Sequence, residues 1–368
     1  MATDIPKKMK AIQITEYRKP YELRDAEVPF DLAPVDMLVK VAVASHCHTD
    51  SMVQNGVFGT KLPVTASHEG SGTVVALGLE AERLGFKVGS RVMCGIPYHA
   101  CGKCVECKGP ENQTQYCRNV EGMLGVYTHG FLADYAKVDA RFTTLLPNEV
   151  KFESAAPLAC AGRTIWRGVL QTGLEKGEWV ALVGSGGGLG HLGIQFAKAL
   201  GLKVIGIDAR DDGLDLSKKI GADVVADARK GKDEVVKEVE KVTDGRRADS
   251  TICVSDAQSA AGLACAVTKM HGTVVQIAQP DNIEVPFQEI VFRDVRIHGS
   301  LVCSAEESKS MLNTVAKHGI SVKTNPFHGL ESIGNLVEMV HSGKIQGKAI
   351  IIVDKEQIEQ EKKIGAKY

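Results

Sequence analysis

The stretch "WVALVGSGGGLGHLGIQFAKALGLKVIGID", residues 179–208, decides how the second half of this chain folds. It opens with an apolar run typical of a buried strand and passes through a glycine-rich turn. It continues with the apolar spacing of a helix and closes on a second apolar run, "KVIGID". A strand, a turn, a helix and a strand in this order form the unit from which parallel sheets are built. The stretch therefore predicts an α/β domain.

The glycine turn has a spacing that suits phosphate binding. Glycine permits a tight turn and lets backbone N–H groups approach a pyrophosphate at the positive end of a helix. The candidate cofactor-binding residues of this turn are Gly184, Gly187, Gly188, Leu189 and Gly190. Asp208 ends the next strand, where a carboxylate can bond a ribose 2′-OH and repel a 2′-phosphate. The pattern favours NAD, and the nearby Arg210, which can pair with a phosphate, keeps NADP open.

The rest of the chain extends this pattern in both directions. At 368 residues it is too long for one ordinary core, so we expect more than one domain. Residues 1–155 read as short strands punctuated by glycine and proline, which predicts a mostly β domain. Residues 156–302 alternate helices and strands, which predicts a doubly wound parallel sheet that binds a dinucleotide. Residues 303–368 should return to the first domain, and their charged end, 355–368, should be a solvated helix or a frayed end.

Composition narrows the function. Lysine plus arginine (44) nearly balances aspartate plus glutamate (45), so no basic excess supports nucleic-acid binding. Neither a signal peptide nor a run of ~20 apolar residues is found, so we expect a cytoplasmic protein without a membrane partner. Ten cysteines in such a chain favour metal binding or catalysis over disulfides. We expect Cys253, Cys265, Cys303 and Cys94 to be buried as small apolar residues.

Four cysteines lie close together in "CGKCVECKGPENQTQYC", residues 101–117. Thiolates two residues apart in tight turns can share one tetrahedral zinc ion at sulfur distances of ~2.3 Å. The predicted ligands are Cys101, Cys104, Cys107 and Cys117. Four protein ligands leave no open position, so the spacing predicts a structural zinc site, with an iron–sulfur cluster as the weaker alternative.

A second group of metal-capable residues follows an expected strand, in "HCHTD" (46–50). Cys47 and the later His68 would supply two ligands, and a second cysteine would leave the fourth position open, as catalytic zinc requires. The residues alone do not decide whether that cysteine is Cys160 or Cys94. Asp50 can accept the second ring N–H of His68, and Thr49 offers a hydroxyl that both donates and accepts a proton.

Taken together, the motifs resemble those of the zinc-dependent medium-chain alcohol dehydrogenases, with "CHTD", "HEGSG", the four-cysteine loop, "CAG" and the glycine turn in the family's order. The pattern looks closest to the yeast and fungal branch. The resemblance covers nearly the whole chain, except mainly the last fifteen or so residues. The resemblance implies a GroES-like catalytic domain and a Rossmann cofactor domain. It implies reversible hydride transfer between a primary alcohol (possibly a secondary or aromatic one) or its aldehyde and NAD, two zinc ions per subunit, and a homotetramer or homodimer.

Residue roles also follow from the resemblance. It implies that Cys160 completes the catalytic zinc site with Cys47 and His68, and that Glu69 lies close behind the metal. It implies that Thr49 bonds the substrate oxygen. It also implies that His48 and Lys348 contact the cofactor pyrophosphate.

Four departures from the family pattern matter. The loop after Cys107 is about two residues longer, the segment between Cys47 and His68 is about two residues shorter, and two further departures are substitutions. Met52 stands where a histidine commonly ends a proton relay, and a thioether cannot carry a proton, so the relay must leave through the cofactor ribose or through His48. Ser67 replaces a usual glycine before the ligand histidine. The expected substrate pocket is lined by Thr49, Met52, Phe58 and Ile96.

Two other functions are compatible with parts of the sequence. A zinc-free quinone or enone reductase of the same superfamily would share the glycine turn but lack the ligand set. A scaffold protein with a zinc ribbon would need a basic face around the cysteine loop, whereas that loop mixes both signs of charge, as Lys103 and Glu106 illustrate.

Overall fold

The computed structural model describes residues 5–109, 113–343 and 345–368. The chain divides into two compact units, one of residues 1–161 with 303–368 and one of residues 162–302. The first boundary lies after Ala161, later than the expected residue 155. The reason is local: a helical segment begins at Phe152, packs on strands of the first unit and continues past the boundary into the second unit.

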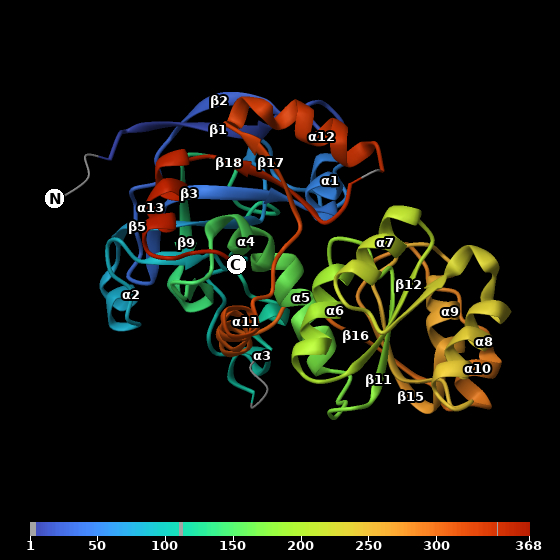
Figure 1. Ribbon diagram of the computed structural model, residues 1–368. Coiled ribbons are helices and arrows are strands. Elements are labelled where there is room, and N and C mark those ends of the chain that lie inside the picture. The colour runs from blue at the N-terminus through green and yellow to red at the C-terminus, as the bar shows by residue number, and fades with distance from the viewer. Residues whose placement is uncertain (1–4, 110–112, 344) are drawn as a thin grey trace. The chain divides into compact units, whose positions relative to one another are not determined.

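The second unit is a six-stranded sheet with helices on both faces, as Figure 1 shows. Its strands are β11 (Trp179–Val183), β12 (Lys203–Asp208), β13 (Val224–Asp227), β14 (Ala248–Cys253), β15 (Thr268–Gln276) and β16 (Arg296–Gly299). They lie in the order β13-β12-β11-β14-β15-β16, and every neighbouring pair is parallel. Numbered from the first strand of the unit this order is 3-2-1-4-5-6, the doubly wound arrangement. The prediction of a doubly wound sheet is confirmed.

Helices cover both faces of the sheet, and the side chains of its central strands are almost all buried. The helices of this unit are α5 (Arg163–Leu170), α6 (Gly190–Ala199), α7 (Asp211–Lys219), α8 (Lys232–Val242), α9 (Ala260–Val267) and α10 (Phe287–Val291). α6 packs on β11 and β12, α7 packs on β12 and β13, and α9 packs on β14 and β15 with α8 beside it. α6 lies close to the sheet because Gly193 has no side chain; a Cβ there would lie 2.4 Å from Leu182.

The first unit is mostly β, as predicted. Its largest sheet has the order β10-β6-β5-β3-β18-β17, with β9 also paired to β3. These strands are β3 (Asp36–His46), β5 (Glu69–Leu77), β6 (Arg91–Met93), β9 (Tyr135–Asp139), β10 (Thr144–Leu145), β17 (Thr324–His328) and β18 (Lys348–Ile352). A three-stranded sheet of β2 (Glu22–Glu27), β1 (Lys8–Ile14) and β4 (Val64–Thr65) and a short pair, β7 (Pro97–Tyr98) with β8 (Gly122–Met123), complete it. The buried core lies between these elements and includes Ile12, Val39, Val74, Phe131 and Ile351.

Among its described residues, the first unit also has seven α-helices. They are α1 (His48–Gln54), α2 (Leu79–Arg83), α3 (Val105–Lys108), α4 (Phe152–Pro157), α11 (Ala305–His318), α12 (Ile333–His341) and α13 (Lys355–Lys363). α11 begins with a capping box between Ser304 and Glu307 and ends at Gly319, which adopts a left-handed φ of 65°. The charged end of the chain is helical, as predicted, but one face of α13 is buried, so this segment is neither fully solvated nor frayed.

Two further sequence expectations can be compared with the fold. Cys94, Cys253, Cys265 and Cys303 are all buried, as expected of small apolar residues. In the part of the chain that the structure describes, every helix is too short or too polar to cross a bilayer.

Candidate active site

Four side chains that can bind a metal meet in the first unit. The ligand atoms of Cys47, His68, Glu69 and Cys160 all lie within 4.8 Å of one another. The structure therefore brings Cys160 to Cys47 and His68, while Cys94 lies outside this group.

The three expected ligands come from three elements. β3 ends at His46, so Cys47 caps α1. β3 pairs antiparallel with β5, and the register places Ser45 opposite Glu69, which brings His68 next to Cys47. Cys160 lies in a π-helical turn, Leu158–Gly162, that joins α4 to α5. Such turns re-aim side chains and occur frequently at functional sites.

Asp50 orients the ligand histidine. Its Oδ1 lies 2.8 Å from His68 Nδ1, and its Oδ2 accepts the backbone N–H of Cys47 at 2.8 Å. His68 Nε2 is buried and makes no hydrogen bond within the described residues. A histidine with one nitrogen held by a carboxylate and the other left for an ion is the usual arrangement of a zinc ligand. The donor set and the orphaned Nε2 fit a zinc ion.

A buried ion pair lies beside the ligands. Lys348 Nζ is 2.9 Å from Glu69, and Glu69 Oε1 also accepts the Ala161 N–H at 3.3 Å. Burial raises the pKa of Glu69 to about 7, and the Lys348 charge opposes that rise. Burial disfavours a charged Lys348, but the charges of Cys47 and Glu69 outweigh it, and the lysine pKa is raised. The family resemblance implies that Lys348 contacts a cofactor. In this structure its ammonium forms an ion pair with Glu69.

Of the two ligand thiols, Cys47 is placed to ionise, whereas the hydrogen bond to Cys47 and burial raise the pKa of Cys160. A hydrogen bond from Cys160 lowers the pKa of Cys47, burial opposes this shift, and the nearby positive charge of Lys348 adds to it. Metal binding needs the thiolate form, so a lowered thiol pKa favours it.

The backbone conformation at Ser67 explains why the family usually has glycine before the ligand histidine. Its φ is 71°, a left-handed conformation that glycine adopts without strain and serine does not. The serine side chain offsets this cost, because Oγ donates to the Ser45 carbonyl at 2.7 Å. This bond ties the segment before His68 to the end of β3.

The remaining expected site residues of the first unit differ in exposure. His48 is exposed and Thr49 and Met52 are partly buried, all on α1. Ile96 is buried, and Phe58 packs on the core of this unit with its ring 6.3 Å from that of Tyr127.

The four cysteines of the loop also converge. Sulfur separations are 3.4 Å for Cys104–Cys107, 3.6 Å for Cys117–Cys101, 3.8 Å for Cys104–Cys117 and 4.0 Å for Cys101–Cys107. A tetrahedral zinc with sulfur at ~2.3 Å needs separations of about 3.8 Å. Backbone N–H groups of Lys103 and Cys104 lower the pKa of Cys101 to about 6. The loop is therefore arranged to hold an ion with four sulfurs.

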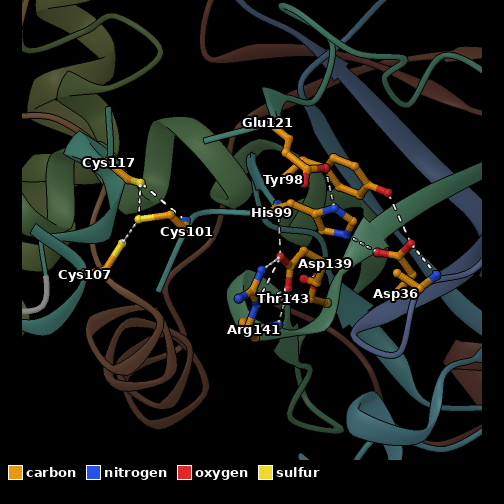
Figure 2. A network of polar contacts seen from close by, with 11 residues as sticks. Asp36, Tyr98, His99, Cys101, Cys107, Cys117, Glu121, Asp139, Arg141 and Thr143 are labelled. Carbon is orange, nitrogen blue, oxygen red and sulfur yellow. Dashed lines mark hydrogen bonds and ion pairs between the residues drawn. The ribbon is translucent and has the colours of Figure 1, made fainter. Parts of the chain in front are cut away.

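A polar network joins this loop to the sheet, as Figure 2 shows. His99 lies 2.7 Å from Asp36 through Nε2 and 2.7 Å from Glu121 through Nδ1, and it stacks on Tyr98. Asp139 accepts the His99 backbone N–H at 3.1 Å. The loop is thus held at both ends, before Cys101 and after Cys117.

In the second unit, the glycine turn contacts the carboxylate of Asp208. Gly186 N–H donates to Asp208 Oδ2 at 2.9 Å, and Arg210 Nε lies 3.3 Å from Oδ1. A Cβ at Gly190 would lie 2.2 Å from the Gly184 carbonyl, whereas one at Gly187 would lie 3.4 Å from it. Gly190 is thus required by close packing within the turn, and Gly187 leaves space.

Comparison with known proteins supports the interpretation of both units. Residues 33–148 match the family described as "Alcohol dehydrogenase GroES-like domain", and residues 188–317 match "Zinc-binding dehydrogenase". An alcohol dehydrogenase of Geobacillus stearothermophilus is 32% identical over 354 residues, which cover 94% of this chain and 100% of the relative. One of Rhizobium meliloti (strain 1021) is 32% identical over 349 residues, covering 93% and 98%.

A solved structure agrees with these relatives. The alcohol dehydrogenase of the archaeon Aeropyrum pernix superposes with a TM-score of 0.83 at 28% identity, covering 93% of this chain and 99% of that one. Fold and ligand sets define a two-domain dehydrogenase. The chain belongs to the zinc-dependent medium-chain alcohol dehydrogenase family, and it is an oxidoreductase. Both named sequence relatives are bacterial, and they do not place the chain in the yeast and fungal branch.

Sequence reasoning missed two features of the site. The pairing of Lys348 with Glu69 joins residues far apart in the chain, and no local pattern announces it. The left-handed φ of Ser67 was signalled only by the glycine usual at that position.

Proposed function

We propose that the enzyme catalyses reversible hydride transfer between a primary alcohol, with secondary and aromatic alcohols as further candidates, and NAD, at a zinc ion bound by Cys47, His68 and Cys160. The observation that carries the proposal is the convergence of these three side chains, with Asp50 holding the far nitrogen of His68. Three protein ligands leave one tetrahedral position for a substrate. A second zinc, on Cys101, Cys104, Cys107 and Cys117, holds the loop.

A zinc ion bound there supplies Lewis acidity toward the alcohol oxygen, and the cofactor supplies the hydride acceptor. Thr49, two residues after Cys47, accepts the alcohol proton through its hydroxyl. Met52 cannot carry the proton further. The exposed His48 on the same helix would pass it to solvent, and a bound cofactor would offer a ribose hydroxyl as the alternative acceptor. Glu69 lies beside the ligands and, in its ionised form, balances the charge of the buried Lys348, which limits the net charge buried at the site.

NAD is the cofactor that the second unit favours. The Asp208 carboxylate lies at the glycine turn, where it would repel a 2′-phosphate, and Arg210 is engaged by that same carboxylate. We propose that Gly184, Gly187, Gly188, Leu189 and Gly190 form the pyrophosphate turn, and that NADP is the poorer cofactor.

We further propose a cytoplasmic homo-oligomer, a tetramer or a dimer. In the second unit, Phe287, Val291 and Phe292 are 60%, 65% and 69% exposed, on and beside α10. β16, the next strand, is an edge of the sheet. Exposed apolar side chains beside an open edge fit burial against a second copy. Membership of the yeast and fungal branch rests on the motifs of the first unit and stays a prediction.

The test is a panel of primary, secondary and aromatic alcohols and aldehydes, assayed with NAD and with NADP at the nicotinamide absorbance. We expect turnover with NAD on at least one simple alcohol and none in Cys47→Ala, which should still bind NAD. Turnover retained by a Cys47→Ala protein of measured metal content would refute the ligand assignment. Turnover that prefers NADP would refute the cofactor assignment alone.

A further inference from the structure

The last helix of the chain makes buried polar contacts, which its charged sequence does not predict. α13 holds Gln357 and Glu361 at 6% and 3% exposure, although Glu359 between them is 67% exposed at its side chain. Buried polar groups are stable only with hydrogen-bond partners. The partners of these two residues lie on other elements of the first unit.

Glu361 caps α4. Its Oε2 accepts the backbone N–H of Phe152, the first residue of α4, at 2.8 Å, and it also meets Arg91 Nη2 at 2.6 Å. The residue at the N-cap, Lys151, supplies no side-chain bond to the helix. Its own N–H donates to the Tyr368 carbonyl at 2.8 Å. The N–H groups of Lys151 and Phe152, at the start of α4, are therefore satisfied from the end of the chain.

Gln357 and Asp354 make polar contacts with two strands, β5 and β3. Gln357 Oε1 accepts the hydroxyl of Thr73, in β5, at 2.6 Å, and its Nε2 donates to the Lys40 carbonyl, in β3, at 3.2 Å. Lys40 also pairs with Asp354, the N-cap of α13, at 2.6 Å. One short helix thus contacts β3, β5 and α4.

Each of these three elements is directly adjacent in the chain to a proposed zinc ligand or to the turn that contains one. β3 leads into Cys47, His68 immediately precedes β5, and α4 continues into the turn that contains Cys160. The elements are also joined directly, because Ser71 of β5 donates to the Phe152 carbonyl at 2.8 Å. Phe152 is therefore held from both sides, by Ser71 and by Glu361.

We propose that α13 is a clamp that fixes the three ligand-bearing elements relative to one another, and that Glu361 and Gln357 are positioning residues of the catalytic zinc site. The inference rests on the proposed function, since it takes Cys47, His68 and Cys160 as ligands. Loss of the Glu361 carboxylate would leave the Phe152 N–H and the Arg91 guanidinium without this partner. α4 would then be free to shift, and the Cys160 thiolate with it.

The experiment measures zinc release from the purified holoenzyme to an excess of a colorimetric chelator. In Glu361→Ala we expect one of two zinc ions to leave about tenfold faster, in line with partners that orient metal ligands. Glu361→Gln keeps an oxygen that can accept the Phe152 N–H, so its release should stay within about twofold of the parent. Glu359→Ala, changed on the solvent side of the same helix, should match the parent.

The fast-released ion is assigned by adding Cys160→Ala, which should remove that phase and leave the slow one. If Glu361→Ala does not fold, Thr73→Val is measured in its place and should speed the same release about threefold, since it removes one hydrogen bond. Parental release in Glu361→Ala, or in Thr73→Val where it stands in, would overturn the clamp. So would equal acceleration of both ions, which indicates general destabilisation. A parent that binds no second zinc would instead refute the proposed function.

Discussion

Asp50 Oδ1 lies 2.8 Å from His68 Nδ1, and both side chains are almost completely buried, at 1% and 2% exposure. The other oxygen of the same carboxylate accepts the N–H of Cys47. One side chain therefore orients two proposed ligands that come from different elements. In the folded protein the His68 pKa is raised, because the Asp50 charge outweighs the effect of burial.

The first prediction concerns this carboxylate. Asp50→Asn can keep only one of the two hydrogen bonds, because its amide nitrogen cannot accept the Cys47 N–H. We expect zinc affinity at the catalytic site to fall by about tenfold or more while the four-cysteine site is unchanged. Metal content after graded chelation measures both, with Asp25→Asn as the exposed control. Equal affinity in the two proteins would mean that Asp50 does not support the ligands.

The second prediction separates two glycines of the cofactor turn. Gly190→Ala places a Cβ 2.2 Å from the Gly184 carbonyl, so we expect the second unit to lose about 2 kcal/mol or more of stability. Gly187→Ala meets that carbonyl only at 3.4 Å and should fold normally, but should weaken NAD binding if a pyrophosphate approaches the turn there. Thermal unfolding and NAD titration distinguish the two. Tight NAD binding by Gly187→Ala would place the pyrophosphate elsewhere.

The third prediction concerns the proton route. Met52 is partly buried on α1, one turn beyond Thr49, where a histidine could extend a proton chain. Met52→His should raise kcat near neutral pH if proton transfer limits turnover. The measurement is a pH–rate profile with a solvent isotope comparison. An unchanged profile would show that the proton has another exit or that a different step is slower.

The fourth prediction is a pH dependence of stability. Thr65 N–H donates to His129 Nδ1 at 3.1 Å, so this nitrogen must be unprotonated, and partial burial lowers the His129 pKa below its usual value. The unfolded chain then takes up the proton first as the pH falls. This contribution is present above ~6.5, the ordinary pKa, and is lost as the pH drops toward the folded pKa. Because His129 is partly exposed to solvent, we expect only about 0.5 kcal/mol.

Urea unfolding of the parent and of His129→Asn, at about pH 7 and about pH 5.5, measures this contribution. Asparagine can accept the Thr65 N–H without titrating in this range. The parent should lose more stability on acidification than the variant does. The same loss in both would assign the pH dependence to other groups.

The sequence predicts local parts of the site well and distant parts poorly. The four-cysteine loop and the "HCHTD" ligand lie within short segments, so residue spacing is enough to propose them. The choice of Cys160 over Cys94 depends on how a turn far along the chain packs, and only the family resemblance favoured it. Glu361 shows the same limit. Its charged sequence context suggests a solvated side chain, but in the structure the side chain is buried, and its hydrogen-bond partner, the Phe152 N–H, lies 209 positions away.

The most direct test of the account is the zinc content of two cysteine variants. We predict that Cys160→Ala retains one zinc ion per chain, on the four-cysteine loop, and that Cys94→Ala retains two. Both cysteines were candidates from the sequence, but only Cys160 lies with Cys47 and His68. Two ions in Cys160→Ala, or one in Cys94→Ala, would contradict the catalytic site proposed here.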